Sequence, residues 1–458
     1  MGNAKKRSGS VASMLPVLLA CSFTASFGQS MMNVALPELA ERFGVTLSIA
    51  NWVIVGYMVV AATAIMLSAF MLRRLGLRRV FFVGAGALAL GSACALLSQD
   101  FPMLFASRLV QAVGTGLFFP SVTSVIMTNS PAAVRGTRLA LNSGVIAVGL
   151  AISPTASGFA LTQFGWRAMF VVSLAMSVAL LAVGFFRIHG GPSTKRVPID
   201  ALSVMLGPLG LAAFLYGLGE VTRDLAPSLA ALAVGAVLLA LFAWRQFALE
   251  SPLLDLHPLV HPRFAVGILL VMVGMLTSFS MSILLPLCYE GALGYTAFFA
   301  GLLLLGPVLV NAAFTFLGGR VFDRHGAWPL IPAGLVLVLV GQATAFFSAE
   351  SMIAILIVLS SAAVYAGAGF VVAPSKTAAL GTLPPATYSA GASINSTAVQ
   401  IASAIGSSLF VGVLSADVLR DTAAFEHTLS IAVVIAAAGL LVAFFYARAM
   451  RKPAGKQR

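Results

Sequence analysis

Long apolar stretches separated by short polar segments fill this sequence almost from end to end. A membrane-spanning helix needs roughly 20 mainly apolar residues, and runs of that length span a bilayer as helices. The pattern therefore predicts an all-α membrane protein with fourteen transmembrane helices. We place them at 12–35, 47–71, 79–98, 102–128, 138–163, 166–188, 200–219, 226–247, 264–288, 295–318, 328–348, 352–373, 386–415 and 426–448.

Positive charge supports this count and predicts an orientation. Both termini and the connections after even-numbered helices hold most of the 27 lysines and arginines. Lysine and arginine gather on the cytoplasmic side of membrane proteins. We therefore expect a multi-pass protein of the plasma (inner) membrane with cytoplasmic N- and C-termini. On the opposite side we find only Arg42, Arg167, Arg223 and Arg420.

Composition excludes several classes of protein. Hydrophobic residues make up 60% and charged residues 9% of the chain, whereas soluble domains carry about 25% charged residues. The net charge of +13 is explained by the orientation and does not indicate a nucleic-acid partner. The sequence lacks a G-x-x-x-x-G-K-[ST] phosphate loop, an H-E-x-x-H motif and clustered metal ligands. We expect no ATP, no cofactor, no metal and no enzymatic activity.

Three short patterns recur in the same order about 250 residues apart. The pairs are 44–46 with 294–296, 69–76 with 319–326, and 114–121 with 367–375. The recurrence predicts two six-helix halves, 1–190 and 263–458, and a linker at 191–262 that carries helices seven and eight. Paired halves of this kind are a transporter architecture, with the substrate site at the midplane between them.

Arg108 is the strongest candidate for a functional residue, because its charge lies inside a predicted transmembrane helix. A charge at that depth costs about 3 kcal/mol by insertion scales and needs a partner or a wet cavity. Gln111 lies on the same helix face, three residues on. Arg108 either faces a central cavity, where it contacts substrate or relays protons, or braces neighbouring helices by hydrogen bonds.

Other polar side chains within predicted helices either line a cavity or hydrogen-bond between helices. Glu290 is a candidate proton carrier if it is buried, and a solvated loop carboxylate if it is not. The candidates for substrate contact, besides Arg108 and Gln111, are Gln29, Asn33, Asn142, Asn311, Asn395 and Gln400.

Several motifs resemble the major facilitator superfamily, and within it the fourteen-helix drug:proton antiporter branch. The resemblance covers nearly the whole chain. It is carried by Asn33-Val34-Ala35-Leu36-Pro37 with Asn51-Trp52-Val53 and Tyr57, by Arg73-Arg74-Leu75-Gly76-Leu77-Arg78-Arg79, by Arg108, Gln111, Gly114 and Gly116, by Pro154, Gly158, Trp166-Arg167 and Phe170, and by Gly391-Ala392-Ser393, Asn395 and Gln400.

The resemblance implies the major facilitator fold, and a structural role for Arg74, Gly76, Asp323 and Arg324 in the loop motifs that brace the inner ends of helices. The chain also departs from the branch. The branch has an acid where this chain has Gly28, and another where it has Arg73. Its helix-five motif reads Gly-Pro and Gly-Gly, where this chain has Ser153-Pro154 and Ser157-Gly158.

The resulting hypothesis is a secondary active transporter of small lipophilic compounds. Alternating access and export of drugs or metabolites follow from the resemblance, and the missing acids leave proton coupling open. Because the predicted interior is poor in carboxylates, we expect neutral or anionic substrates. The alternatives are a lipid or lysophospholipid flippase or an uncoupled facilitator on the same fold. An integral-membrane enzyme is disfavoured, because no catalytic cluster is visible at any depth. A channel is the other alternative, and it would conduct far faster than a rocking carrier.

Overall fold

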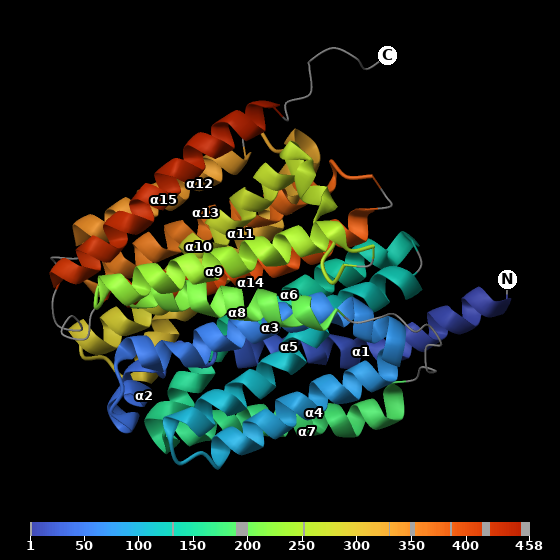
Figure 1. The fold of residues 1–458 in the computed structure, drawn as a ribbon, viewed down its shortest axis with the longest axis horizontal. Coiled ribbons are helices and arrows are strands. Elements are labelled where there is room, and N and C mark those ends of the chain that lie inside the picture. Colours follow the sequence, from blue (N-terminus) through green and yellow to red (C-terminus); the bar gives the residue numbers. More distant parts are fainter. Residues whose placement is uncertain are drawn as a thin grey trace.

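The computed structural model describes residues 2–130, 132–188, 200–250, 252–328, 330–348, 353–384, 387–414 and 422–449, and within these ranges every regular element is a helix (Figure 1). The helices are α1 (Gly2–Ser30), α2 (Leu36–Phe43), α3 (Leu47–Leu75), α4 (Leu77–Leu96), α5 (Phe101–Asn129), α6 (Ala132–Phe164), α7 (Trp166–Arg187), α8 (Ala201–Gly219), α9 (Leu225–Ala248), η1 (His257–Val260), α10 (Pro262–Leu287), η2 (Cys288–Ala292), α11 (Ala297–His325), α12 (Leu330–Ser348), α13 (Ala354–Leu380), α14 (Tyr388–Val413) and α15 (Thr422–Ala449).

Thirteen helices in the described ranges are long and apolar enough to cross a membrane. The apolar stretch Met14–Ser30 of α1 adds a shorter one. Together they account for the fourteen expected spans, so the prediction of an all-α, multi-pass membrane protein is confirmed.

Several helix ends differ from the sequence prediction, and two of them lie near prolines. The first span ends at Ser30 rather than residue 35, and after a turn the chain forms the short helix α2. Leu36 and Leu39 of α2 are buried. Helix α13 runs to Leu380, seven residues beyond the predicted end at 373, because Pro374 lies inside the helix rather than after it.

The sequence repeat corresponds to repeated local structure. Gly44 and Gly294, 250 residues apart, have positive φ angles of 61° and 66°, which favour glycine. Each is followed by a threonine cap, because the hydroxyls of Thr46 and Thr296 accept hydrogen bonds from the backbone N–H three residues on. Gly76, φ 79°, likewise joins α3 to α4, and its counterpart Gly326, φ 75°, ends α11.

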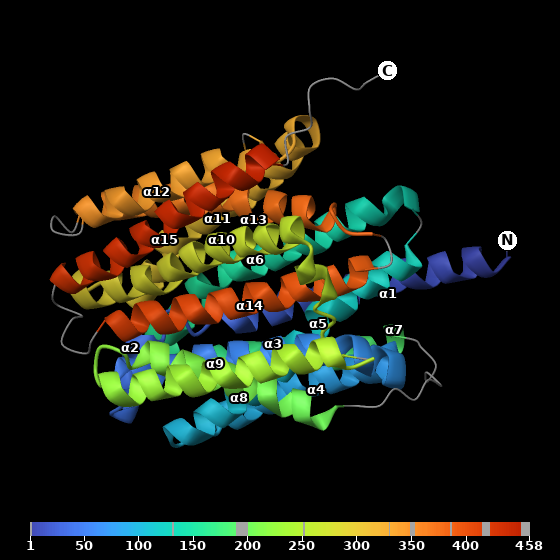
Figure 2. The same cartoon turned by 45° about the horizontal axis from the view of Figure 1, so that its top comes forward.

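The helices pack into two groups with matching internal contacts. In the N-terminal group, α1 to α7, helix α5 contacts α1, α3 and α4. In the C-terminal group, α10 to α15, helix α13 makes the equivalent contacts with α10, α11 and α12. Helices α6 and α11, and α3 and α14, pack across the seam between the groups. Figure 2 shows the C-terminal group above the N-terminal group.

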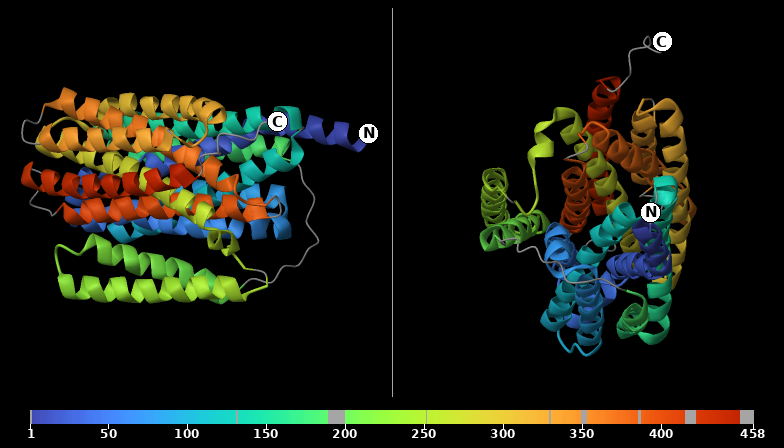
Figure 3. Two further views of the ribbon diagram at one scale, coloured as in Figure 1. Left: turned by 90° about the horizontal axis from the view of Figure 1, so that it is seen from above. Right: turned by 90° about the vertical axis from the view of Figure 1, so that its right-hand side faces the viewer.

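The α8–α9 hairpin lies on the outside of the bundle, where it packs against α14 and α3 (Figure 3). Its base is fastened by Asp200, which caps α8 and accepts two hydrogen bonds of 2.7 Å from the Arg245 guanidinium. Hydrogen bonding to this guanidinium holds the pKa of Asp200 well below its usual range. The ion pair therefore persists at any physiological pH.

The two ends of the bundle are distinct. One end carries α2 and the turns at Gly44 and Gly294, and we call it the α2 end. The other carries the turns at Gly76 and Gly326, and in Figure 1 the start of α1 and the end of α15 lie on its side, so we call it the termini end.

Glycines allow α6 and α11 to meet closely across the seam. A Cβ atom at Gly158 would lie 2.3 Å from the Ala297 carbonyl oxygen, and one at Gly301 would lie 2.4 Å from the Pro154 carbonyl oxygen. Both obstacles are backbone atoms, which cannot move aside as a side chain can. A side chain at either position would push the two groups apart.

We expect Gly301→Leu to destabilise the protein by about 1–3 kcal/mol, the usual cost of overpacking. The matched control is Gly306→Leu on the same helix, because a Cβ atom there has open space around it. Thermal unfolding of the purified variants in detergent measures the difference. Equal melting temperatures for the two variants would contradict the close approach of α6 and α11.

Candidate functional site

A polar cavity of about 370 Å³ lies between the two helix groups. Helices α1, α3, α5 and α6 form one side, and α10, α11, α13 and α14 form the other. Its wall combines apolar side chains with many hydroxyls and amides, the mixture typical of a small-molecule site. Among the residues that line it are Ser30, Phe119, Thr123, Ser143, Phe279, Ser282, Thr315, Tyr365 and Ser396.

Five of the eight residues predicted to contact substrate line this cavity, namely Gln29, Asn142, Asn311, Asn395 and Gln400. The Gln29 amide donates to the Gln400 amide oxygen at 3.1 Å, which links α1 to α14. Two polar atoms at the wall, Asn395 Oδ1 and Gln400 Nε2, have no partner among the described residues. The first is a hydrogen-bond acceptor and the second a donor.

The other two amides in this set are held by neighbouring helices. Asn142 accepts a hydrogen bond of 2.7 Å from Ser22, and Asn311 donates one of 2.8 Å to the Tyr365 carbonyl. These bonds fix the orientation of both side chains at the cavity wall.

Lys376 is the one charged side chain among the described residues that line the cavity. The sequence prediction does not include it, because the predicted span 352–373 ends three residues before Lys376 and leaves it in the following connection. In the structure it lies on α13, toward the termini end, and is exposed. A lysine within an apolar span is a functional signal by itself, and that signal could have found it.

Arg108 lies outside the cavity lining and is completely buried within the N-terminal group. It donates hydrogen bonds to the Gly28 carbonyl at 3.1 Å, the Val53 carbonyl at 3.4 Å and the Gln111 amide oxygen at 2.6 Å. Its guanidinium carbon also lies 4.1 Å from the centre of the Tyr57 ring, a cation–π contact.

Arg108 thus joins α1, α3 and α5, and the geometry matches the bracing alternative rather than direct contact with substrate. Gln111 completes the cluster, because its amide donates to the Ser92 hydroxyl of α4 at 2.7 Å. Neither residue lines the cavity in this structure, so their expected contact with substrate stays a prediction.

Hydrogen bonds across the seam gather toward the α2 end. Asn51 of α3 and Ser407 of α14 exchange two of them, at 3.2 and 2.8 Å. Asn33 donates to Ser282 of α10 at 2.7 Å and does not line the cavity. Thr155 of α6 donates to the Gly301 carbonyl at 2.8 Å. These contacts join the two groups at the α2 end.

Three carboxylates also lie at the α2 end. Glu290 belongs to the π-helix η2, is half-buried, and its Oε1 atom has no partner among the described residues. Glu38 is close enough to interact with it electrostatically. Glu220 is buried and accepts a hydrogen bond from Ser48 of α3. None of the three lines the cavity.

The predicted loop motifs lie at the termini end. Gly76 is buried at the junction of α3 and α4, and Arg74 is exposed with its guanidinium 5.8 Å from the Phe70 ring centre. Arg324 is exposed at the end of α11. The side chains of Arg73 and Asp323 lie outside the described residues, so the expected bracing role of the motif stays a prediction.

A bundle of apolar helices around a polar cavity, built from two groups with matching contacts, defines a membrane transporter. The sequence matches the Major Facilitator Superfamily over residues 18–407, with a further match over 266–458. The chain belongs to this superfamily, as its motifs predicted, and it is a transporter rather than an enzyme.

The relatives include drug-resistance proteins. The chain is 31% identical to the lincomycin resistance protein LmrB of Bacillus subtilis, with 95% of each protein covered. It is 26% identical to the methylenomycin A resistance protein of Streptomyces coelicolor, with 88% of this chain and 84% of the relative covered. Among solved structures, the xylose transporter XylE from E. coli matches with a TM-score of 0.65 at 15% identity, covering 98% and 100% of the chains.

We expect Arg108→Ala to lower stability by about 2 kcal/mol or more, because buried acceptors on three helices lose a charged donor. Arg108→Lys will recover only part of the loss, since an ammonium group lacks the guanidinium fork. The control is Arg79→Ala, which removes an exposed arginine. If Arg108→Ala unfolds at the same temperature as the control and transports normally, both the bracing role and a direct role are wrong.

We also expect Asn51→Ala to loosen closure at the α2 end, because it removes both hydrogen bonds to Ser407. The native Cys288, buried beside this end, can report the change after Cys21 and Cys94 are replaced by serine. A charged thiol reagent should then label Cys288 faster in Asn51→Ala than in Ser92→Ala, which removes hydrogen bonds inside one group. Unchanged labelling in both would show that these bonds do not hold the end closed.

Proposed function

We propose that this protein exports small lipophilic compounds from the cytoplasm by alternating access, with the cavity between the helix groups as its substrate site. The single observation that carries the proposal is a cavity lined by both groups, with hydrogen bonds across the seam toward one end of the bundle. The drug-resistance relatives support export rather than uptake.

The proposal places the termini end in the cytoplasm of a plasma (inner) membrane protein, as the distribution of lysine and arginine predicts. The structure then represents an inward-facing state, with its seam closed toward the outside. Rocking of one group against the other would break the bonds at the α2 end and expose the cavity there.

The wall of the cavity favours neutral or anionic substrates. Its described residues include many amides and hydroxyls and the ammonium group of Lys376, but no carboxylate. A lipophilic dication would find no counter-charge in this cavity, whereas an anion would find Lys376.

Proton coupling requires a group that changes protonation between the two states. Glu290 is the candidate, because opening of the α2 end would bring its unpartnered carboxylate into water. Coupling through Glu290 is a separate part of the proposal. A carrier that moves substrate without protons would be a facilitator on the same fold.

The experiment is proton movement in sealed proteoliposomes, followed with an internal pH dye while neutral, anionic and cationic lipophilic compounds are added in turn. A substrate-dependent proton flux supports antiport, and a response to neutral or anionic compounds supports the assignment of the cavity. Uptake of compound without proton movement would favour the facilitator. Silence toward compounds that bind, combined with movement of labelled lipid, would replace the proposal with a flippase.

Variants of Lys376 test in the same assay whether the charge at the cavity wall selects the substrate. We expect Lys376→Gln to reduce transport of anionic compounds several-fold while leaving neutral ones nearly unchanged, and Lys376→Arg to keep both. The physical reason is the loss of the one described cation at the cavity wall. Equal loss for neutral and anionic compounds would show that Lys376 serves folding or gating rather than selection of charge.

A further inference from the structure

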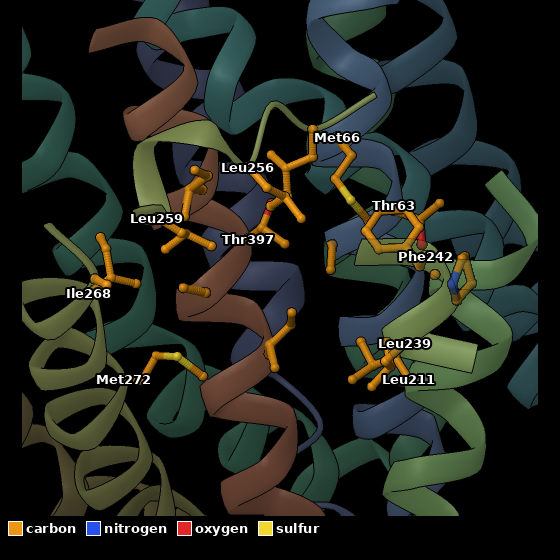
Figure 4. A pocket seen from close by; sticks show the side chains of 18 of the residues that line it. Thr63, Met66, Leu211, Leu239, Phe242, Leu256, Leu259, Ile268, Met272 and Thr397 are labelled. Atoms are coloured by element: carbon orange, nitrogen blue, oxygen red, sulfur yellow. The ribbon is translucent and has the colours of Figure 1, made fainter. Parts of the chain in front are cut away.

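A second cavity of about 370 Å³ lies on the other side of α14, under the α8–α9 hairpin (Figure 4). The hairpin contributes residues such as Leu211 and Phe242, and the segment that follows it contributes Leu256 and Leu259. Helices α3, α10 and α14 form the remaining wall. We call this space the hairpin pocket.

The wall of the hairpin pocket is almost entirely hydrocarbon and thioether. The described residues that line it include no charged side chain, and their only side-chain hydroxyls belong to Thr63 and Thr397. Thr63 donates to the Val59 carbonyl of its own helix. Thr397 is 3% exposed, and its hydroxyl has no hydrogen-bond partner within the part of the chain that the structure describes.

An unpartnered hydroxyl in such a wall costs free energy unless something bonds to it. Figure 4 shows the Thr397 side chain in the wall of the pocket, on the same side as Leu256 and Leu259. A bound molecule with one carbonyl, ether or hydroxyl oxygen could satisfy it. The pocket volume lies within the range of small-molecule sites, roughly 300–1,000 Å³.

Helix α14 separates the hairpin pocket from the substrate cavity. Its residues Thr397 and Ala398 face the pocket, while Asn395 and Gln400 face the cavity. Helix α10 divides in the same way, with Met272 on the pocket side and Met275 on the cavity side. The apolar hairpin pocket and the polar substrate cavity are therefore separated by the thickness of one helix.

The hairpin pocket also lies close to the surface that faces lipid. The outer surface of the hairpin exposes large apolar side chains such as Leu241 and Trp244, which meet lipid in a membrane. The hairpin contacts the rest of the bundle mainly through α3 and α14. A molecule dissolved in the bilayer would have to pass only this hairpin to reach the pocket.

We propose that the hairpin pocket binds one uncharged lipophilic compound taken from the bilayer, and that it is an access site beside the substrate cavity. A phospholipid chain fits the chemistry less well, since no described cation lines the pocket to hold a phosphate headgroup. The binding stands without the proposed function, whereas the access role rests on it.

The test of binding uses a radioactive, iodinated aryl-trifluoromethyl diazirine, which is an uncharged photolabel, on the full chain in phospholipid vesicles. Labelled peptides are mapped with and without excess non-radioactive probe. We expect saturable labelling of segments that contain Met66, Met272 or Thr397. Residues that face lipid, such as Trp244, should be labelled in proportion to probe, without saturation.

Saturation at a probe content far below that of the lipid shows that the site prefers the compound to lipid chains, which are always in excess. Labelling of the pocket segments that rises without saturation means that lipid chains or packed side chains occupy the space, and it overturns the proposal. This comparison needs no variant, so poor folding of a mutant cannot obscure it.

Two variants then fill the pocket from different helices, Ala398→Leu on α14 and Ala265→Leu on α10. We expect each to reduce the saturable labelling several-fold, and Leu241→Phe on the outer face of the hairpin to leave it unchanged. Thr397→Val, which keeps the volume, should weaken binding of probes that carry a carbonyl and spare pure hydrocarbons. Saturable labelling that survives both filling variants overturns the assignment to this pocket.

The access role is tested by transport in the same vesicles. Ala398→Leu should slow transport of the most lipophilic compounds several-fold and leave a water-soluble anionic compound unaffected. Loss of labelling with unchanged transport of every compound would overturn the access role. Failure of the unmodified protein to transport any compound would instead count against the proposed function, and saturable labelling would still be measured.

Discussion

Polar side chains inside a bilayer must find partners within the protein, and this requirement organises the whole bundle. The fully buried Arg108 donates to acceptors on α1, α3 and α5, and its Nη2 atom has no partner among the described residues. Neutral amides and hydroxyls connect the two groups toward the α2 end. The atoms left without partners include Asn395 Oδ1 and Gln400 Nε2, at the cavity wall.

The fold could be predicted from the sequence because its strongest signals are local. Apolar runs predicted the membrane-spanning helices. Some of these helices begin at capping residues that recur 250 residues apart, such as Thr46 and Thr296. Two of the exceptions lie at prolines. Pro37 lies in the first turn of α2, where a longer first span was expected, and Pro374 is accommodated within α13. Proline signals a change in the chain but does not say whether the helix stops.

The candidate site could be predicted only in part, because sequence fixes which groups need partners but not where those partners lie. Gln29 and Gln400 meet across 371 positions, a pairing that no local pattern contains. The cost of burying Arg108 predicted that its side chain lies either in a water-filled cavity or among hydrogen-bond acceptors. In the structure, backbone carbonyls of α1 and α3 are the acceptors. Those carbonyls carry no signature in the sequence.

The difference between the bonds within a group and those across the seam determines how the molecule can move. Hydrogen bonds between neutral side chains in membrane proteins contribute about 0.6–1.7 kcal/mol each, so the Asn51–Ser407 and Asn33–Ser282 contacts are individually weak. The Arg108 cluster is charge-assisted and stronger. The seam is therefore the weaker contact, and in the proposed alternating access each group would move as a unit. Because α14 lies at this seam and borders both cavities, any motion of the groups must change the wall between them.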